Sequence, residues 1–244
     1  MPTGLGACYN ILSCGLKGVW RTIKALALLC SLLLLLSGCS AADPDAVSQA
    51  TLVRFRENEI MEYQGARLDP AVGPRDVSIN GVQHVDMAAY TLTVDGLVNE
   101  AKVLSYESVI SLPAYERLIT LHCVEGWDAT ILWKGVLLSD LFELAGVKPE
   151  ANTVIFHAVD DYTTSLPLST VLDRKMIMAY QANGIDLPPE MGYPFIIVAE
   201  DKLGYKWARW VDKITLSDDE DYKGFWERNG YSNDASVDGP ARGN

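Results

Sequence analysis

The stretch LITLHCVEGWD, residues 118–128, joins a short predicted strand to a turn and contains one cysteine. Alternation along the strand places Cys123 on the same face as the aliphatic Ile119, and His122 on the opposite face. Gly126 then ends the strand. We therefore expect the Cys123 thiol to lie at a strand end, on an aliphatic face and directed away from His122.

The first 38 residues have the pattern of a bacterial lipoprotein signal peptide. Lys17, Arg21 and Lys24 precede an uncharged run from Ala25 to Leu36. This run is too short for a helix that must cross about 30 Å of hydrocarbon. It ends in Leu-Ser-Gly-Cys, residues 36–39, which resembles the lipobox of bacterial lipoproteins. The alternative is an uncleaved N-terminal membrane anchor.

On the lipoprotein interpretation, residues 1–38 are removed and Cys39 carries the lipid. The rest of the chain is then exported and anchored to the outer face of the cell membrane, or to its periplasmic side. The other early cysteines are removed with the signal, so Cys123 is the one thiol left and no intramolecular disulfide forms. A lone cysteine in an exported protein is either a free reactive thiol or a small buried hydrophobe.

The charge balance excludes two classes of partner. The chain has 20 Lys and Arg against 32 Asp and Glu, a net charge of −12. Nucleic-acid binding depends on basic residues that neutralise phosphates, and adhesion to anionic lipid depends on a basic patch. We therefore expect neither nucleic-acid binding nor electrostatic attraction to a membrane surface.

The mature chain divides into four predicted parts: a lipidated tether over 39–50, an irregular arm over 51–86, one domain over 87–234 and a flexible tail over 235–244. Within the domain, short predicted strands alternate irregularly with short helices. Strands are predicted at 90–94, 118–123, 153–158, 162–166, 176–180, 193–199 and 205–216, and helices at 105–110, 139–146 and 168–174. This pattern predicts an α+β or mostly β domain and not a regular βαβ array.

Three chemistries are open to Cys123. It is a nucleophile if His157 or His84 approaches it in space. It is a zinc ligand if several more nitrogen or sulfur ligands gather around it. It is the single protein ligand to a redox metal if an organic cofactor supplies the other bonds. Local sequence does not choose among these three.

A series of ordered motifs from Tyr90 to Asp234 resembles the molybdopterin-binding domain of the sulfite oxidase superfamily. Within it, the chain is most similar in style to the small bacterial enzymes related to the methionine sulfoxide reductase catalytic subunit. The resemblance rests on YTLTVDGLV (90–98), CVEGW (123–127), WKGV (133–136), AY (179–180), NG (183–184), LP (187–188), GYKWARWV (204–211) and GFWERNGY (224–231).

This resemblance implies an α+β fold with mixed and antiparallel sheets and short helices. It also implies that Cys123 binds molybdenum together with the two dithiolene sulfurs of molybdopterin. Glu125 occupies the position of an acidic residue near the metal, where a carboxylate relays protons. Tyr162 resembles a tyrosine near the metal in some relatives.

Four further residues lie in the segment that matches the family's cofactor-binding segment, namely Gly204, Tyr205, Lys206 and Arg209. The two cations in this segment are the expected partners of the pterin phosphate. The resemblance also implies pterin contacts for Arg67 and His84, which lie in the arm.

Three departures from the family pattern affect the expected function. Sulfite oxidases carry an arginine shortly after the metal cysteine, whereas this chain has Asp128, which would repel sulfite. Met191 and Ile196 stand where relatives often place polar or basic cofactor contacts. The signal also lacks adjacent arginines, although molybdopterin enzymes are normally exported by the twin-arginine route.

These observations predict an extracytoplasmic, molybdopterin-dependent oxidoreductase that performs two-electron oxygen-atom transfer on a small substrate, not sulfite. Its electrons pass to or from a separate partner, such as a cytochrome or a quinone-linked membrane redox protein. The alternative is a non-catalytic lipoprotein of the same fold that binds a ligand or partner.

Overall fold

The computed structural model describes residues 47–73 and 78–243, and both ranges belong to the same structural unit. The predicted signal peptide, the lipidated Cys39 and most of the predicted tether lie outside the described residues. Over the two described ranges, no helix is long enough and apolar enough to cross a membrane.

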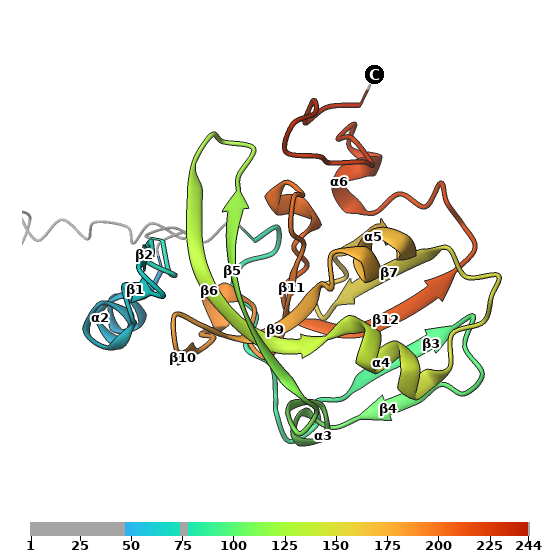
Figure 1. Ribbon diagram of the computed structural model, residues 1–244, viewed down its shortest axis with the longest axis horizontal. Coiled ribbons are helices and arrows are strands. Elements are labelled where there is room, and N and C mark those ends of the chain that lie inside the picture. The colour runs from blue at the N-terminus through green and yellow to red at the C-terminus, as the bar shows by residue number, and fades with distance from the viewer. Residues whose placement is uncertain (1–46, 74–77, 244) are drawn as a thin grey trace, which may run out of the picture. The chain divides into compact units, whose positions relative to one another are not determined.

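The first sheet is antiparallel and carries the stretch that contains Cys123 (Figure 1). Its strand order is β10–β9–β6–β5, with β11 also paired to β9. The strands are β5 (Ala114–His122), β6 (Asp128–Leu137), β9 (Ile177–Ala182), β10 (Ile185–Asp186) and β11 (Ile196–Val198). β5 and β6 pair along their whole length, from Ala114 opposite Val136 to His122 opposite Asp128. This long hairpin fixes the position of its connecting turn, in which Cys123 lies.

The second sheet is mixed, with the strand order β4–β3–β12–β7–β8. Its strands are β3 (Leu92–Gly96), β4 (Lys102–Leu104), β7 (Thr153–Ala158), β8 (Thr163–Pro167) and β12 (Val211–Ser217). β12 runs parallel to β3 and antiparallel to β7. Together the two sheets confirm the predicted α+β class with mixed and antiparallel sheets.

Short helices follow the sequence signals closely. α3 (Tyr106–Ile110) begins after Ser105, whose side chain accepts a hydrogen bond from the Ser108 N–H. α4 (Leu138–Ala145) ends at Gly146, which adopts the left-handed conformation that favours glycine. Its buried face contacts β3 and β6, one strand from each sheet. α5 (Leu168–Asp173) and α6 (Phe225–Arg228) complete the helices of the domain.

The N-terminal arm is more ordered than predicted. It contains α2 (Gln49–Asn58), which begins inside the predicted tether, and a small hairpin of β1 (Glu62–Tyr63) and β2 (Ala66–Arg67). Phe55 is 1 % exposed and anchors the helix in the core. The Glu59 carboxylate accepts hydrogen bonds from the Ala71 N–H and the Asn183 side chain. The arm is therefore part of the domain, and the predicted boundary at residue 87 is wrong.

The predicted flexible tail also packs on the domain. Ala235 is fully buried, and its carbonyl accepts a hydrogen bond from the Leu203 N–H. Arg242 lies over the ring of Tyr231 at 4.5 Å. These contacts hold residues 235–243 in place, so the prediction of a loose tail is wrong for them.

The predicted strand over 205–216 is shorter than expected. Residues Gly204–Lys206 form a 3-10 turn, η2, and β12 begins only at Val211. Trp210 adopts a positive φ of 50°, which breaks the strand, and its indole N–H donates to the Pro189 carbonyl. The strand predicted over 193–199 is likewise reduced to β11.

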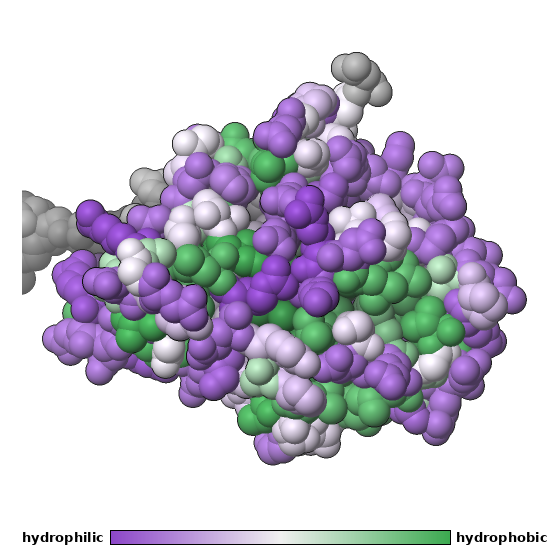
Figure 2. Space-filling model, viewed as in Figure 1, coloured by the Kyte–Doolittle hydropathy of each residue, from purple (hydrophilic) through white to green (hydrophobic). Residues whose placement is uncertain are grey.

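Hydrophilic side chains cover most of the face shown in Figure 2 and separate smaller patches of apolar surface.

Candidate functional site

Cys123 lies one residue beyond the end of β5, and not within the strand as predicted. Its N–H donates to the Trp127 carbonyl at 2.9 Å, and its carbonyl accepts from the Gly126 N–H at 3.0 Å. Gly126 has a φ of +85°, which only glycine adopts readily. His122 bridges to Leu203, so the backbone of Gly204 lies directly beside Cys123. The turn therefore holds the thiol at a defined place next to the Gly204 segment.

The surroundings of the thiol affect its charge in opposite directions. Burial raises the pKa of Cys123, and the nearby Glu125 carboxylate raises it further. The backbone N–H groups of Glu125 and Val124 and the charge of Arg209 lower that pKa. The pKa of the Cys123 thiol is raised overall, so the protonated form is favoured until a metal binds, and coordination to a metal deprotonates such a thiol.

A cavity of about 980 Å³ lies beside this turn. The arm contributes to its wall through Phe55, and the first sheet contributes Trp133 and Ile131. Charged side chains on the wall are mostly acidic: Glu59, Asp69, Glu125, Asp128 and Glu190 against Arg56 and Arg209. This volume is at the upper end of the range for cofactor and ligand sites.

Arg209 lines both this large cavity and a smaller one. Its guanidinium donates to the Glu190 carbonyl at 3.0 Å. Gly192 packs so closely against Arg209 that a Cβ added to the glycine would lie 2.6 Å from the arginine Cβ. The absence of a side chain at Gly192 therefore sets the position of Arg209.

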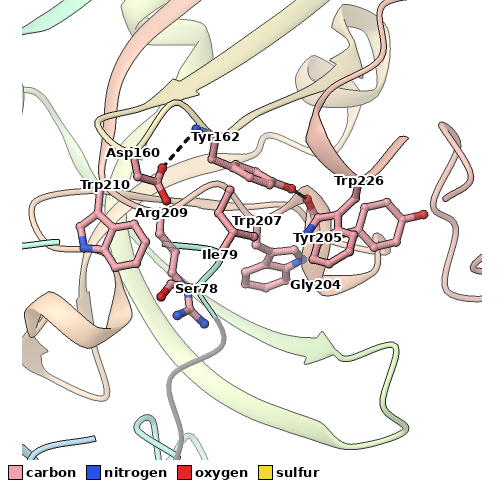
Figure 3. A pocket seen from close by; sticks show the side chains of 10 residues that line it. All are labelled: Ser78, Ile79, Asp160, Tyr162, Gly204, Tyr205, Trp207, Arg209, Trp210 and Trp226. Carbon is pink, nitrogen blue, oxygen red and sulfur yellow. Dashed lines mark hydrogen bonds between the residues drawn. The ribbon is translucent and has the colours of Figure 1, made fainter. Parts of the chain in front are cut away.

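The smaller cavity has a volume of about 80 Å³ and lies between the β7–β8 turn and the Gly204 segment (Figure 3). Half of the ten residues on its wall are aromatic, namely Tyr162, Tyr205, Trp207, Trp210 and Trp226. The two charged groups on the wall are Asp160 and Arg209. Since Gly204 also lines it, this cavity borders the backbone of Cys123.

The hydroxyl groups of two tyrosines in this wall donate hydrogen bonds to backbone carbonyls. Tyr162 donates to the Tyr205 carbonyl, and Tyr205 donates to the Ser232 carbonyl. Burial raises the pKa of both tyrosines well above the ordinary value, so both stay protonated at neutral pH. Tyr162 thus lies in the small cavity, near the predicted metal ligand, with its hydroxyl oriented by the Gly204 segment.

Lys206 does not face either cavity. Its side chain is fully buried, and its ammonium donates to the Ser165 carbonyl, the Asn233 side chain and the Glu227 carboxylate. An ammonium group has three N–H donors, and all three are engaged. The prediction that Lys206 contacts the pterin phosphate is therefore wrong, and of the two predicted cations only Arg209 reaches the cavities.

Three other predicted residues lie at the edge of the site or outside it. Glu125 is exposed, accepts a hydrogen bond from the Trp127 indole at 3.2 Å and lines the large cavity. Arg67 on β2 and His84 in the arm are both exposed. Neither Arg67 nor His84 lines the two cavities, so the structure does not bring them to the site.

The two competing chemistries of Cys123 find little support. His157 lies on β7 in the second sheet, where its Nε2 is 3.1 Å from the Thr215 hydroxyl. His122 pairs with Asp128 at 2.7 Å across the hairpin. Within residues 47–73 and 78–243, no three His, Cys, Asp or Glu side chains come together as a metal site. A thiol ligand to a cofactor-borne metal is the remaining interpretation.

The residues present fit such a cofactor. The Cys123 turn adjoins a cavity of cofactor size through Glu125 and Trp127, and Arg209 on the cavity wall offers a cation to a phosphate. Met191 and Ile196 line the large cavity and are buried, so they offer apolar packing where relatives often place polar contacts.

Sequence reasoning missed two parts of the site. Residues of the arm, including Phe55 and Glu59, line the large cavity although the arm was predicted to be irregular. Asp160 was predicted only as part of a turn, yet it is 9 % exposed and lines the small cavity. The sequence around Asp160 does not show that its carboxylate is buried while that of the adjacent Asp161 is exposed.

Comparisons with known proteins agree with this geometry. A family model described as "oxidoreductase molybdopterin binding domain" matches residues 79–226. The chain is 43% identical over 147 residues to the oxidoreductase YuiH of Bacillus subtilis, a match that covers 60% of this chain and 74% of the relative. It is 30% identical over 213 residues to a putative protein-methionine-sulfoxide reductase subunit, YedZ1, of Azospira oryzae, covering 81% of this chain and 80% of the relative.

A solved structure supports the fold alone. The sulfane dehydrogenase SoxCD from Paracoccus pantotrophus matches with a TM-score of 0.58 at 20% identity, over 80% of this chain and 58% of that chain. Since the family model spans more than half of the sequence, the chain belongs to the oxidoreductase molybdopterin-binding domain family and is a molybdenum-dependent oxidoreductase that uses molybdopterin.

Proposed function

We propose that this protein is an extracytoplasmic molybdopterin enzyme that transfers an oxygen atom to or from a small substrate other than sulfite. The observation that carries the proposal is the Cys123 turn, whose residues Glu125 and Trp127 line the large cavity and whose backbone packs against Gly204 on the wall of the small one. One thiol is enough, because a molybdopterin-bound metal needs a single bond from the protein.

Each part of the site has a role in this proposal. Cys123 ligates the metal, Arg209 binds the pterin phosphate, and Met191, Ile196 and Trp133 pack against the pterin in the large cavity. The bound molybdenum cofactor supplies the two-electron redox chemistry. Gly204, whose backbone lies against that of Cys123, lines the small cavity together with Tyr205, and the reacting end of the substrate binds at this junction.

Sulfite is disfavoured as the substrate by charge. Glu125 and Asp128 follow the metal ligand Cys123 closely in sequence. Carboxylates this close to the metal ligand repel a sulfite dianion, whereas they do not repel a neutral oxide. The relative named as a putative methionine-sulfoxide reductase subunit supports an uncharged sulfoxide as the first substrate to test.

The location and partner are part of the same proposal. The lipobox at residues 36–39 supports export and anchoring through a lipid on Cys39. Because the proposed site holds a single redox group, electrons pass to or from a separate carrier protein. Cys39→Ala should move the protein from the membrane fraction to the soluble extracytoplasmic fraction, while the wild-type protein stays with the membrane.

Metal analysis of the purified protein tests the central claim. Protein from a molybdenum-competent host should contain about one molybdenum and one pterin per chain, and Cys123→Ala should lose most of the metal. Glu116→Gln, on the exposed part of β5, is the matched control and should load normally. Wild-type protein without molybdenum, or full loading of Cys123→Ala, contradicts the proposal. The first result would favour the non-catalytic alternative.

A further inference from the structure

Asp160 is a buried residue whose carboxylate lines the small cavity, and the proposed function gives it no role. It lies in the turn between β7 and β8, and its side chain points toward the cavity beside Tyr162 and Arg209 (Figure 3). One carboxylate oxygen accepts a hydrogen bond from the Tyr162 N–H at 3.2 Å. Its backbone carbonyl accepts from the Asn80 side chain at 3.1 Å. The carboxylate is therefore held in one orientation at the cavity wall.

The environment of Asp160 favours the protonated form. Burial raises the pKa of its carboxyl group, and the neighbouring Asp161 adds to that effect. The Tyr162 N–H and Arg209 act in the opposite direction. Asp212 on β12 is the other carboxylate nearby, and its own pKa is also raised by burial. Aromatic rings make up most of the remaining wall, and they stabilise an ionised carboxylate poorly.

Oxygen-atom chemistry on an uncharged oxide needs such a group. Reduction of a sulfoxide or an amine N-oxide breaks the bond to oxygen, consumes two electrons and two protons, and releases the sulfide or amine together with water. The bound molybdenum cofactor would supply the two electrons, with a separate electron-carrier protein as their source. The two protons must reach the departing oxygen inside the site. In the reverse reaction, the same two protons leave the water that supplies the oxygen.

We propose that Asp160 is a catalytic residue that transfers a proton to or from the substrate oxygen in the small cavity. The inference rests on the proposed function. A volume of about 80 Å³ holds a reacting group of a few heavy atoms, and the aromatic wall suits alkyl substituents.

Glu125, the carboxylate predicted from sequence for this task, is less well placed. It is exposed, it is engaged by the Trp127 indole, and it lines the large cavity and not the small one. Glu125 and Asp160 are therefore alternative candidates for the proton-transfer role, and variants of each residue distinguish between them.

The test compares Asp160→Asn with Asp161→Asn, a matched control on the next residue. Asp161 is exposed and does not line the small cavity, and its positive φ is one that Asn adopts readily. The amide oxygen introduced by Asp160→Asn still accepts from the Tyr162 N–H, so the fold should be retained. Turnover is measured with dimethyl sulfoxide and a reduced viologen dye, alongside molybdenum content. We expect unchanged loading in both variants, a loss of about 100-fold in kcat for Asp160→Asn and less than about twofold for Asp161→Asn.

The pH profile provides a second criterion. Because the donor must be protonated, wild-type kcat should fall as pH rises through the Asp160 titration, and Asp160→Glu should retain part of the rate with a displaced profile. Turnover of loaded Asp160→Asn within threefold of wild type overturns the inference. A loss in Glu125→Gln without a loss in Asp160→Asn also overturns it and assigns the role to Glu125.

A measurement without the metal separates this inference from the proposed function. Trp207, Trp210 and Trp226 line the cavity with Asp160, so tryptophan fluorescence of metal-free protein reports its titration. We expect a transition at a pH above that of an exposed aspartate, present in Asp161→Asn and absent in Asp160→Asn. A transition that survives Asp160→Asn, or none at all, contradicts the inference even if the protein loads molybdenum. Normal titration with no metal in wild type contradicts the proposed function instead.

Discussion

Lys206 lies in a motif that predicts a phosphate contact, but its side chain forms a buried ion pair instead. Its neighbours in sequence, a glycine and several aromatic residues, are those of a phosphate site, and the chain is acidic overall. The structure instead pairs it with Glu227, a residue 21 positions later, with both side chains fully buried. Burial lowers the pKa of Lys206, while the Glu227 carboxylate opposes that shift. The pair joins the Gly204 segment to α6.

Breaking this pair should be costly. Lys206→Met leaves the Glu227 carboxylate buried without its cation, which costs about 3–5 kcal/mol of the free energy of unfolding. Replacing both residues with Met should recover much of that loss, because no unpaired charge remains. Urea unfolding curves measure both effects. Lys102→Met is the control, since the Lys102–Glu100 pair is solvent-exposed on the Glu100 side and should change stability by less than about 0.5 kcal/mol.

For single residues, the sequence predicts which chemistry a side chain can perform, but it does not predict which residue that side chain contacts. Cys123 could be singled out because the predicted lipidation and signal removal would leave no other thiol, and its turn was visible from Gly126. Lys206 was misassigned and Asp160 was missed for one reason. Whether a charged side chain faces a cavity or a buried partner depends on contacts such as Lys206 with Ser165, which are distant in sequence.

The pairing of β6 with β9 requires a glycine at position 135. A shift in register between Lys134 and Gly135 brings the backbone of β9 unusually close. A Cβ added at Gly135 would lie 2.1 Å from the Met178 carbonyl oxygen. Because backbone atoms of a central strand cannot move away cheaply, β6 and β9 pair at this distance only with glycine.

Gly135→Ala should therefore destabilise the first sheet by about 1–3 kcal/mol or more, measured by chemical denaturation. Gly73→Ala is the matched control, because a Cβ there meets nothing within 4 Å and no positive φ is involved. Equal stability of the Gly135 variant and the wild type would contradict the close approach of the two strands.

Elements with a clear local pattern were predicted well. The strands at β7 and β8, the capped α3, the glycine-terminated α4 and the Asn183–Gly184 turn between β9 and β10 lie where the sequence indicated. The failures have tertiary causes. Residues 205–210 alternate like a strand, but the Trp210 indole and its positive φ stop the pairing. α2 was missed because Phe55 is its one fully buried side chain, which gives almost no helical periodicity.

For the molecule as a whole, tyrosines control stability at alkaline pH. Burial raises the pKa of Tyr106 to about 12, and it raises the pKa of Tyr90, Tyr162 and Tyr205 still further. Unfolded tyrosines ionise near about pH 10. Above that pH the native state holds more protons than the unfolded state, so the stabilisation present below about pH 10 is lost as pH rises toward about 12.

Urea unfolding at pH 8, 10 and 11.5 should show this loss, and absorbance of tyrosinate at 295 nm should rise abruptly with unfolding. Tyr106→Phe should make the decline with pH shallower, since one titrating group is removed. A stability that stays constant from pH 8 to pH 11.5 would contradict the burial of these hydroxyl groups.

Because β12 lies at the centre of the second sheet, that sheet can form only after β12 has been synthesised. Its neighbours β3 and β7 are synthesised long before it, yet in the sheet order β4–β3–β12–β7–β8 they share no edge until β12 enters between them. Such long-range pairing is slow, and the waiting strands keep exposed edges. Arg209 lies two residues before β12, so the segment that ends in this late strand also brings into place the arginine that lines both cavities. A nascent chain therefore has no finished cofactor site, and insertion of the cofactor must follow synthesis of nearly the whole domain.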